Sequence, residues 1–165
     1  MEPNDVLVIL KIAAAGHCEW TPESLALELG LEALEIEASL ERLKSEGILA
    51  PTGRPDRERL KRFLLIELPE RFPAKPGKLA RGHLTGAKQG PYLGMDLPYT
   101  SIWVWPQENG PHWGFSVKPL SPHCCFAVRN DGRLRKLLSV TETLRISGKE
   151  ARLWAEVLFR QFGLF

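Results

Sequence analysis

A cluster of basic side chains follows residue 50 of this 165-residue chain. It consists of Arg54, Arg57, Arg59, Lys61 and Arg62, with only Asp56 and Glu58 between them. Guanidinium groups donate paired hydrogen bonds to phosphate oxygens, and such contacts position a protein on nucleic acid without reading its sequence. A sparser basic group follows, made of Lys75, Lys78 and Arg81. We therefore expect both groups to contact the backbone of double-stranded DNA, in a salt-sensitive and weakly sequence-specific way.

Residues 31–43 (LEALEIEASLERL) have the opposite character. If they form a helix whose core side is Ile36, Leu40 and Leu43, the outward side carries Leu34, Glu35, Glu37, Ala38 and Glu41. A carboxylate can accept from cytosine, but several together are repelled by the charge of a duplex. Carboxylates near the N-terminus of a helix also stabilise it through the helix dipole, without any partner. This alternative does not explain why Leu34 and Ala38 face outward among them. These five outward side chains are therefore the candidates for a contact with a protein.

The chain shows no pattern typical of a catalytic or metal site. The neighbours His17-Cys18 and His123-Cys124-Cys125 lack the spacing that brings zinc ligands together, so buried structural cysteines and free thiols are favoured. P-loop, G-x-S-x-G, H-E-x-x-H and dinucleotide signatures are missing, and His83 and His112 are isolated. We expect no enzyme activity, no cofactor and no metal.

Three tryptophans lie close together at Trp103, Trp105 and Trp113. They could stack on unpaired bases, as aromatic side chains do in proteins that bind single strands. In a strand, however, Trp103 and Trp105 share one face, and tryptophan is highly buried on average. Packing against the core is therefore the favoured interpretation, and base stacking is the alternative.

Composition is that of a soluble globular protein, with 44% hydrophobic and 25% charged residues. The net charge of +2 hides a strong segregation, because residues 1–50 hold ten acidic and three basic side chains, whereas residues 51–90 hold four acidic and ten basic. Such a concentrated basic stretch favours an interaction with a polyanion. No apolar run approaches the ~20 residues that span a bilayer, so we expect a cytoplasmic protein without a signal peptide or membrane anchor.

The elements that must position these side chains begin with three helices. Residues 3–15 are an apolar segment closed by Gly16, and Thr21-Pro22 is a typical helix start. Gly30 ends that second helix and leads into the acidic one, which predicts a helix-turn-helix. Residues 48–50 and 63–68 are then predicted strands, and the basic residues between them would form the hairpin called a wing.

The rest of the chain divides into two parts. Residues 69–98 contain five prolines and five glycines, which predicts an extended segment or a linker with little regular structure. Residues 101–120 predict a β-hairpin around Asn109-Gly110, and residues 131–145 an amphipathic helix. Ser147 and Glu150 have the spacing of a capping box for a last helix whose apolar stripe is Ala151, Trp154, Ala155 and Leu158.

Residues 25–49 carry apolar residues and glycines in a distinct order, at Leu25-Ala26, Leu29-Gly30-Leu31, Ile36, Leu40, Arg42-Leu43 and Gly47-Ile48-Leu49. In this order they resemble the winged-helix regulators of bacteria and archaea. The later segments at 72–82, 105–106, 117–122 and 137–155 are similar to poorly characterised winged-helix proteins associated with nucleotidyltransferase-like toxin or defence genes. The resemblance implies a DNA-binding transcriptional regulator or an antitoxin-like role. Glu35, Glu37 and Glu41 depart from such regulators, which place neutral or basic side chains there.

The sequence thus predicts an α+β protein in three parts. These are a winged helix-turn-helix domain at 1–68, a basic Pro/Gly-rich linker or extended segment at 69–98, and a C-terminal hairpin with two helices at 99–165. The predicted function is DNA binding through the basic wing. The alternative is a protein-interaction module that uses the acidic helix face for self-association or partner binding.

Overall fold

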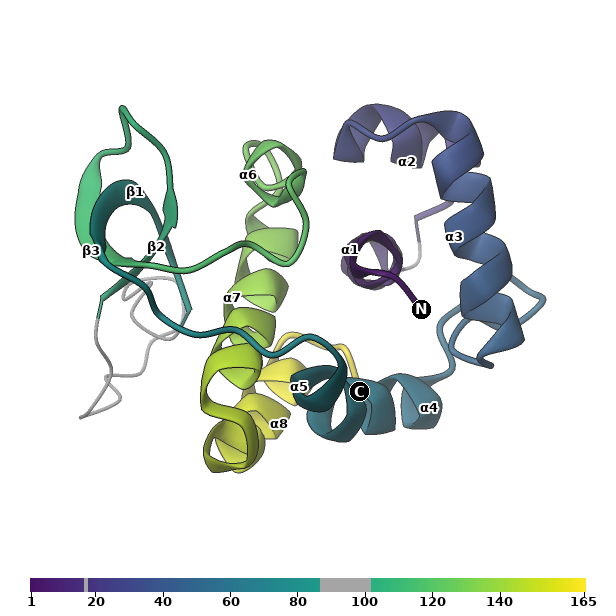
Figure 1. Cartoon of the computed structure of the whole chain (residues 1–165). Helices are drawn as coiled ribbons and strands as arrows, with labels where there is room; N and C mark the ends of the chain where they lie inside the picture. Colours follow the sequence, from purple (N-terminus) through teal and green to yellow (C-terminus); the bar gives the residue numbers. More distant parts are fainter. Residues whose placement is uncertain (17, 87–101) are drawn as a thin grey trace.

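A computed structural model describes residues 1–16, 18–86 and 102–165. The protein is α+β, with a small barrel of three strands beside a larger group of helices (Figure 1). Helix α1 (Pro3–Ala15) lies at the centre of that group, with α2 (Pro22–Leu29) and α3 (Ala33–Ser45) on one side and α7 (Gly132–Ser147) on the other. No helix in the described part of the chain is long and apolar enough to cross a membrane.

The first helix is buried on nearly all sides. Pro3 occupies a first-turn position, where its missing N–H costs nothing, and Glu2 and Asp5 form a capping box. Every residue from Val6 to Leu10 is fully buried, as an apolar helix surrounded by other helices requires. The predicted helix over 3–15 is therefore confirmed.

The second and third helices also begin and end where the sequence predicts. The Thr21 hydroxyl accepts from the Ser24 N–H at 3.2 Å, and Gly30 ends α2 with a left-handed φ of 68°. In α3, the predicted apolar stripe of Ile36, Leu40 and Leu43 is buried. The helix-turn-helix order is present, whereas a winged-helix arrangement is not established.

The predicted wing hairpin is wrong. After the isolated bridge between Leu49 and Pro55, the chain forms α4 (Arg57–Arg62), the π-helical segment η1 (Phe63–Glu67) and α5 (Leu68–Arg71). Asp56 caps this run by accepting from the Arg59 N–H at 2.8 Å. Leu60, Leu64 and Leu68 repeat at helical spacing and are buried. A short apolar run fits a buried helix as well as a strand, and here the cap and the spacing favour the helix.

The three strands are β1 (Leu79–Thr85), β2 (Trp103–Pro106) and β3 (His112–Ser116). Two of them fall where the sequence predicts strands, but they do not form a hairpin. Both β2 and β3 pair antiparallel with β1, and they therefore run parallel to each other. Strand β1 lies in the segment predicted to lack regular structure, so that prediction is wrong for residues 79–85.

Gly82 allows the barrel to close. Residues 79–82 of β1 pair with β3, and residues 82–85 pair with β2. Gly82 therefore belongs to both pairings, opposite His112 of β3 and Pro106 of β2. A Cβ atom at Gly82 would overlap the carbonyl oxygen of Trp105, and one at Gly110 would overlap the backbone of Gly82. The absence of side chains at these two positions lets the backbones approach so closely.

The C-terminal part is helical. It contains α6 (Cys124–Ala127), α7, the 3₁₀ segment η3 (Gly148–Ala151) and α8 (Arg152–Gln161). Asp131 caps α7, as its position before the predicted helix suggests. The predicted capping box at Ser147 does not form, because α7 continues to Ser147 and ends at Gly148 with φ 55°. Ala151, Ala155 and Leu158 of the predicted stripe are buried as expected, whereas Trp154 is half-buried.

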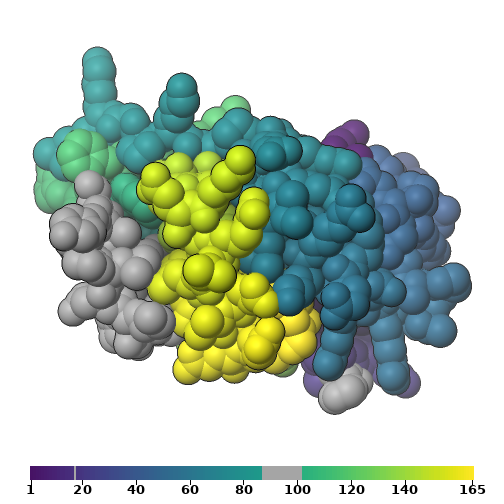
Figure 2. Space-filling view, turned by 90° about the horizontal axis from the view of Figure 1, so that it is seen from below, coloured from purple at the N-terminus to yellow at the C-terminus, as the bar shows by residue number. Residues whose placement is uncertain are grey.

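A single cluster of buried apolar residues extends from Val6 of α1 to Leu164 near the end of the chain. The predicted boundary after residue 68 falls inside the helical run from α4 to α5. Seen from below, the N-terminal part lies at one end of the molecule, the barrel at the other, and α8 between them (Figure 2). The helix-turn-helix and the barrel therefore present different surfaces.

Candidate nucleic-acid interface

The outward face of α3 is exposed and acidic. Leu34 is 78% exposed, and Glu37, Ala38 and Glu41 are also exposed. Glu35 is half-buried because it accepts a hydrogen bond from the amide of Asn4. The structure thus brings four of the five predicted partner-binding residues to the surface of one helix.

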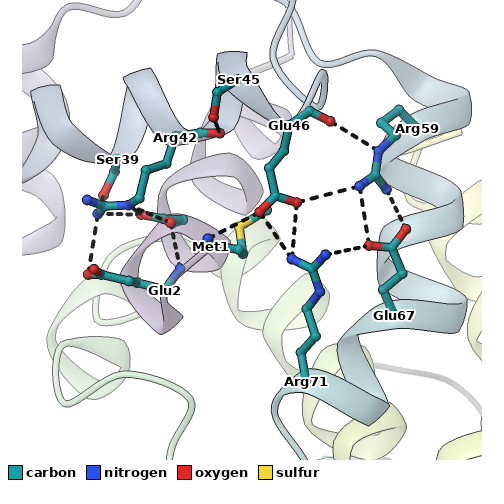
Figure 3. A network of polar contacts seen from close by, with 10 residues as sticks. Met1, Glu2, Ser39, Arg42, Ser45, Glu46, Arg59, Glu67 and Arg71 are labelled. Atoms are coloured by element: carbon teal, nitrogen blue, oxygen red, sulfur yellow. Dashed lines mark hydrogen bonds and ion pairs between the residues drawn. The ribbon is translucent and has the colours of Figure 1, made fainter.

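Three of the five predicted wing cations have partners within the molecule, and Figure 3 shows those of Arg59. Arg59 donates to both carboxylate oxygens of Glu67, at 2.7 and 3.2 Å, and to the carbonyl oxygen of Glu46 at 3.1 Å. Lys61 forms an ion pair with Glu156 of α8 at 2.7 Å. Arg62 is 3.7 Å from Glu67, but its side chain stays 74% exposed. Arg59 and Lys61 therefore connect helices.

Glu46 is the centre of this polar network (Figure 3). Its carboxylate contacts the Met1 ammonium group at 3.1 Å and the Arg71 guanidinium at 3.1 Å. Burial alone would raise the pKa of Glu46, but these bonds outweigh it and hold the pKa below its usual value. Because Glu46 lies at the end of α3 and Arg71 in α5, the network fixes the helix-turn-helix to the following helices.

The other predicted DNA contacts separate into two places. Arg54 and Arg57 are exposed beside the C-terminal end of α1, where they border a cavity. Lys75, Lys78 and Arg81 are exposed before and along β1, in the barrel part of the molecule. The eight predicted residues therefore do not form one continuous basic surface.

Strand β3 displays two aromatic side chains that do not pack in the core. Trp113 is 60% exposed and Phe115 is 43% exposed, whereas Trp103 and Trp105 are buried as the sequence favoured. Phe115 was not identified from the sequence, although the alternation in HWGFS would have placed it on the same face as Trp113. Part of the aromatic surface is thus available to a ligand.

The register assigns neighbours to these aromatics. Arg81 is opposite Trp113 and Leu79 is opposite Phe115 in the antiparallel pair of β1 and β3. Opposite residues in such a pair lie on the same face of the sheet. Leu79, Arg81, Trp113 and Phe115 are all exposed, and we refer to these four residues as the barrel platform. Arg81 is held by a hydrogen bond from its Nε to the Gly110 carbonyl oxygen at 3.0 Å.

The described charged residues of the barrel part are mainly basic, although Glu108 borders a hollow together with Leu79, Arg81 and Trp113. Residues 73–86 and 102–119 contain the cations Lys75, Lys78, Arg81 and Lys118, and their only carboxylate is Glu108. All four cations are exposed. A surface that combines planar aromatic groups with excess positive charge matches the two components of an unpaired nucleic acid strand, its bases and its phosphates.

A buried polar network positions the barrel on α7. Glu142 accepts from the Trp105 indole at 3.3 Å, from the Leu120 N–H at 2.9 Å and from the Arg145 guanidinium at 2.5 Å. Burial raises the pKa of Glu142 in spite of Arg145. Arg145 also donates to the Phe72 carbonyl oxygen at 2.8 Å, so one ion pair connects β2, α7 and the end of α5. We interpret this pair as structural because both partners are buried.

The remaining reactive groups do not assemble into a site. All three cysteines are free thiols, and burial raises the pKa of Cys124 to about 12, so this thiol stays protonated. Within residues 1–16, 18–86 and 102–165, no group of three His, Cys, Asp or Glu side chains is placed to hold a metal ion. Comparison with protein-family models, curated proteins and solved structures finds no match to this chain.

Proposed function

We propose that this protein binds single-stranded nucleic acid on the barrel platform. The observation that carries the proposal is the pair of exposed aromatics, Trp113 and Phe115, on a strand beside Arg81. Stacking of a base on an aromatic side chain contributes about 1–3 kcal/mol and tolerates any base. The nearby lysines supply contacts to phosphates. A regulatory or antitoxin-like role, implied by the resemblance to winged-helix regulators, would then depend on this surface.

The position of the acidic helix supports this assignment. Helix α3 lies on the side of the molecule away from the barrel, so its carboxylates do not face a strand bound there (Figure 1). Binding of duplex DNA through residues 54–62 has less support, because Arg59 and Lys61 already form ion pairs within the protein. An affinity for duplex above that for a single strand is thus the main competing outcome.

Fluorescence anisotropy with a labelled oligonucleotide of about 12 nucleotides tests the proposal. We expect binding at about 50 mM salt that weakens at higher salt. The double variant Trp113→Ala/Phe115→Ala should bind the oligonucleotide with an affinity that is lower by at least about tenfold. The matched control is Leu153→Ala/Val157→Ala, which removes two exposed apolar side chains from α8. Failure to bind at low salt, or equal affinity for the platform variant and the parent, would refute the proposal.

A second candidate function is a protein contact on the helix-turn-helix. Leu27 of α2 is 79% exposed and Leu34 of α3 is 78% exposed, and exposed carboxylates of α3 surround the second of them. An apolar surface bordered by carboxylates fits a partner, or another copy of the chain, with an apolar surface bordered by basic groups. Sedimentation velocity of the Leu34→Arg variant tests this, because the change should dissociate any such complex while oligonucleotide affinity stays constant.

A further inference from the structure

A cavity of about 310 Å³ lies where α1 and α8 end, on a different part of the molecule from the barrel platform. Three arginines from separate segments line it. Arg54 comes from the turn after α3, Arg57 from the first turn of α4 and Arg133 from the first turn of α7. No aspartate or glutamate is among the described residues that line the cavity. Its charged side chains are therefore all positive.

Arg133 is held at the wall of this cavity by its surroundings. Its Nη2 donates to the carbonyl oxygen of Phe162 at 3.1 Å. A Cβ at Gly16 would lie 3.2 Å from Nη1, and one at Gly163 would lie 3.5 Å from Nη2. Both glycines have positive φ angles, 65° and 72°, so the backbone itself disfavours a side chain at either position. The space beside the guanidinium is thus kept open.

The charge at the cavity exceeds what the fold requires. The C-terminal ends of α1 and α8 carry partial negative charge, and Arg133 compensates it through its bond to Phe162. Arg54 and Arg57 have no such contact, since their guanidinium groups form no hydrogen bond or ion pair with any described residue. Because Arg54 and Arg57 are exposed, water screens the repulsion among the three arginines, and an anion bound between them would lower it further.

We propose that this cavity binds the phosphate group of a small molecule. Guanidinium groups bind phosphate oxygens through paired, charge-assisted hydrogen bonds, and several of them favour an anion with two or more charges. Ile12, Ala13 and Leu164 provide an apolar wall for the remainder of the ligand. The volume is at the lower end of the range for pockets that hold small molecules, about 300–1,000 Å³. A phosphorylated metabolite therefore fits both the charge and the size.

Isothermal titration calorimetry with pyrophosphate and with inorganic phosphate tests the proposal on the full chain. We expect saturable binding of pyrophosphate to the parent protein. The affinity for pyrophosphate should be lower by at least about tenfold in Arg54→Gln/Arg57→Gln. These two side chains have no partners among the described residues, so the variant should keep its fold, which circular dichroism verifies. The matched control is Arg62→Gln/Arg160→Gln, because it removes the same charge from side chains that are 74% and 68% exposed elsewhere.

Two results would overturn the proposal. One is a failure of the arginine test, either because pyrophosphate does not bind saturably or because the control variant loses as much affinity, which would make the effect one of net charge. The other is duplex DNA that displaces pyrophosphate and loses affinity in Arg54→Gln/Arg57→Gln, because the cavity would then serve a nucleic acid backbone. The platform variant Trp113→Ala/Phe115→Ala should bind pyrophosphate like the parent, so this site and the proposed oligonucleotide site fail independently.

Discussion

The Arg59 guanidinium donates to both carboxylate oxygens of Glu67, eight residues further along the same helical run, at 2.7 and 3.2 Å. The π-helical segment η1 lies between them and ends at Glu67. A side chain that the sequence assigned to DNA is therefore part of the fold. Because this contact joins two residues of one helical run, the basic segment is held in a helix and does not project as a hairpin.

We expect Arg59→Ala to lower the free energy of unfolding by about 1–3 kcal/mol, because a half-buried charged hydrogen-bonding group is lost and Glu67 loses its closest partner. Arg62→Ala should change it by less than about 0.5 kcal/mol, since its side chain is mostly exposed. Urea denaturation measures both. Equal effects of the two substitutions would show that the Arg59–Glu67 contact does not stabilise the protein.

Glu46 predicts a pH dependence of stability. Its pKa is lowered in the folded protein, so the stabilisation is present above the ordinary pKa of 4.5 and is lost as the pH falls through the folded value. Glu46→Gln should therefore be less stable than the parent at neutral pH, and the two should converge in acid. Thermal unfolding from pH 7 down to about pH 3 checks this. A constant difference over that range would contradict the role of the charge.

Gly82 predicts a strong effect on the barrel. Gly82→Ala places a methyl group against the carbonyl oxygen of Trp105, a backbone atom that cannot move aside as a flexible side chain could. We therefore expect the free energy of unfolding to fall by about 3 kcal/mol or more. Gly132→Ala is the control, because nothing lies within 4 Å of its added Cβ. That change should be neutral or stabilise α7 by up to about 1 kcal/mol. A neutral Gly82→Ala would mean that the strands do not approach as closely as described.

Substitution of the buried Trp105 should affect stability, whereas substitution of the exposed Trp113 should affect binding. Trp105 is buried and its indole donates to Glu142, so Trp105→Ala should cost about 3–5 kcal/mol. Trp113→Ala, on the exposed face, should change stability by no more than about 1 kcal/mol while it weakens oligonucleotide binding. Denaturation and anisotropy on the same samples compare the two. A large stability loss for Trp113→Ala would indicate that this side chain belongs to the core.

The sequence was sufficient for the helices that carry their own start and stop signals. Thr21-Pro22 and Gly30 delimit α2, and the stripe of Ile36, Leu40 and Leu43 orients α3. These signals are local, so no knowledge of the partner elements was needed. Most of the exposed acidic face of α3 followed from the same angular count, and the structure places it there.

The failures have a different origin. The run FLLIEL is apolar without alternation, so its periodicity does not distinguish a strand from a helix, and the feature that favours the helix, the Asp56 cap, precedes the run in the sequence. The hairpin prediction failed because the antiparallel partner of both β2 and β3 is β1, whose residues lie in a Pro/Gly-rich segment without a strand pattern. Pairing between distant segments leaves no local mark. The cavity at Arg54, Arg57 and Arg133 arises in the same way, since its arginines meet only in the folded chain.

The closed order of β1, β2 and β3 also limits how other chains can associate with this protein. An open sheet exposes a row of unpaired backbone N–H and C=O groups at its edge, which can recruit a further strand and promote aggregation. In the described barrel each strand pairs with the other two over part of its length, so only short stretches of unpaired edge are left. Recognition at this end of the molecule should therefore rely more on side chains than on the addition of a strand by a peptide.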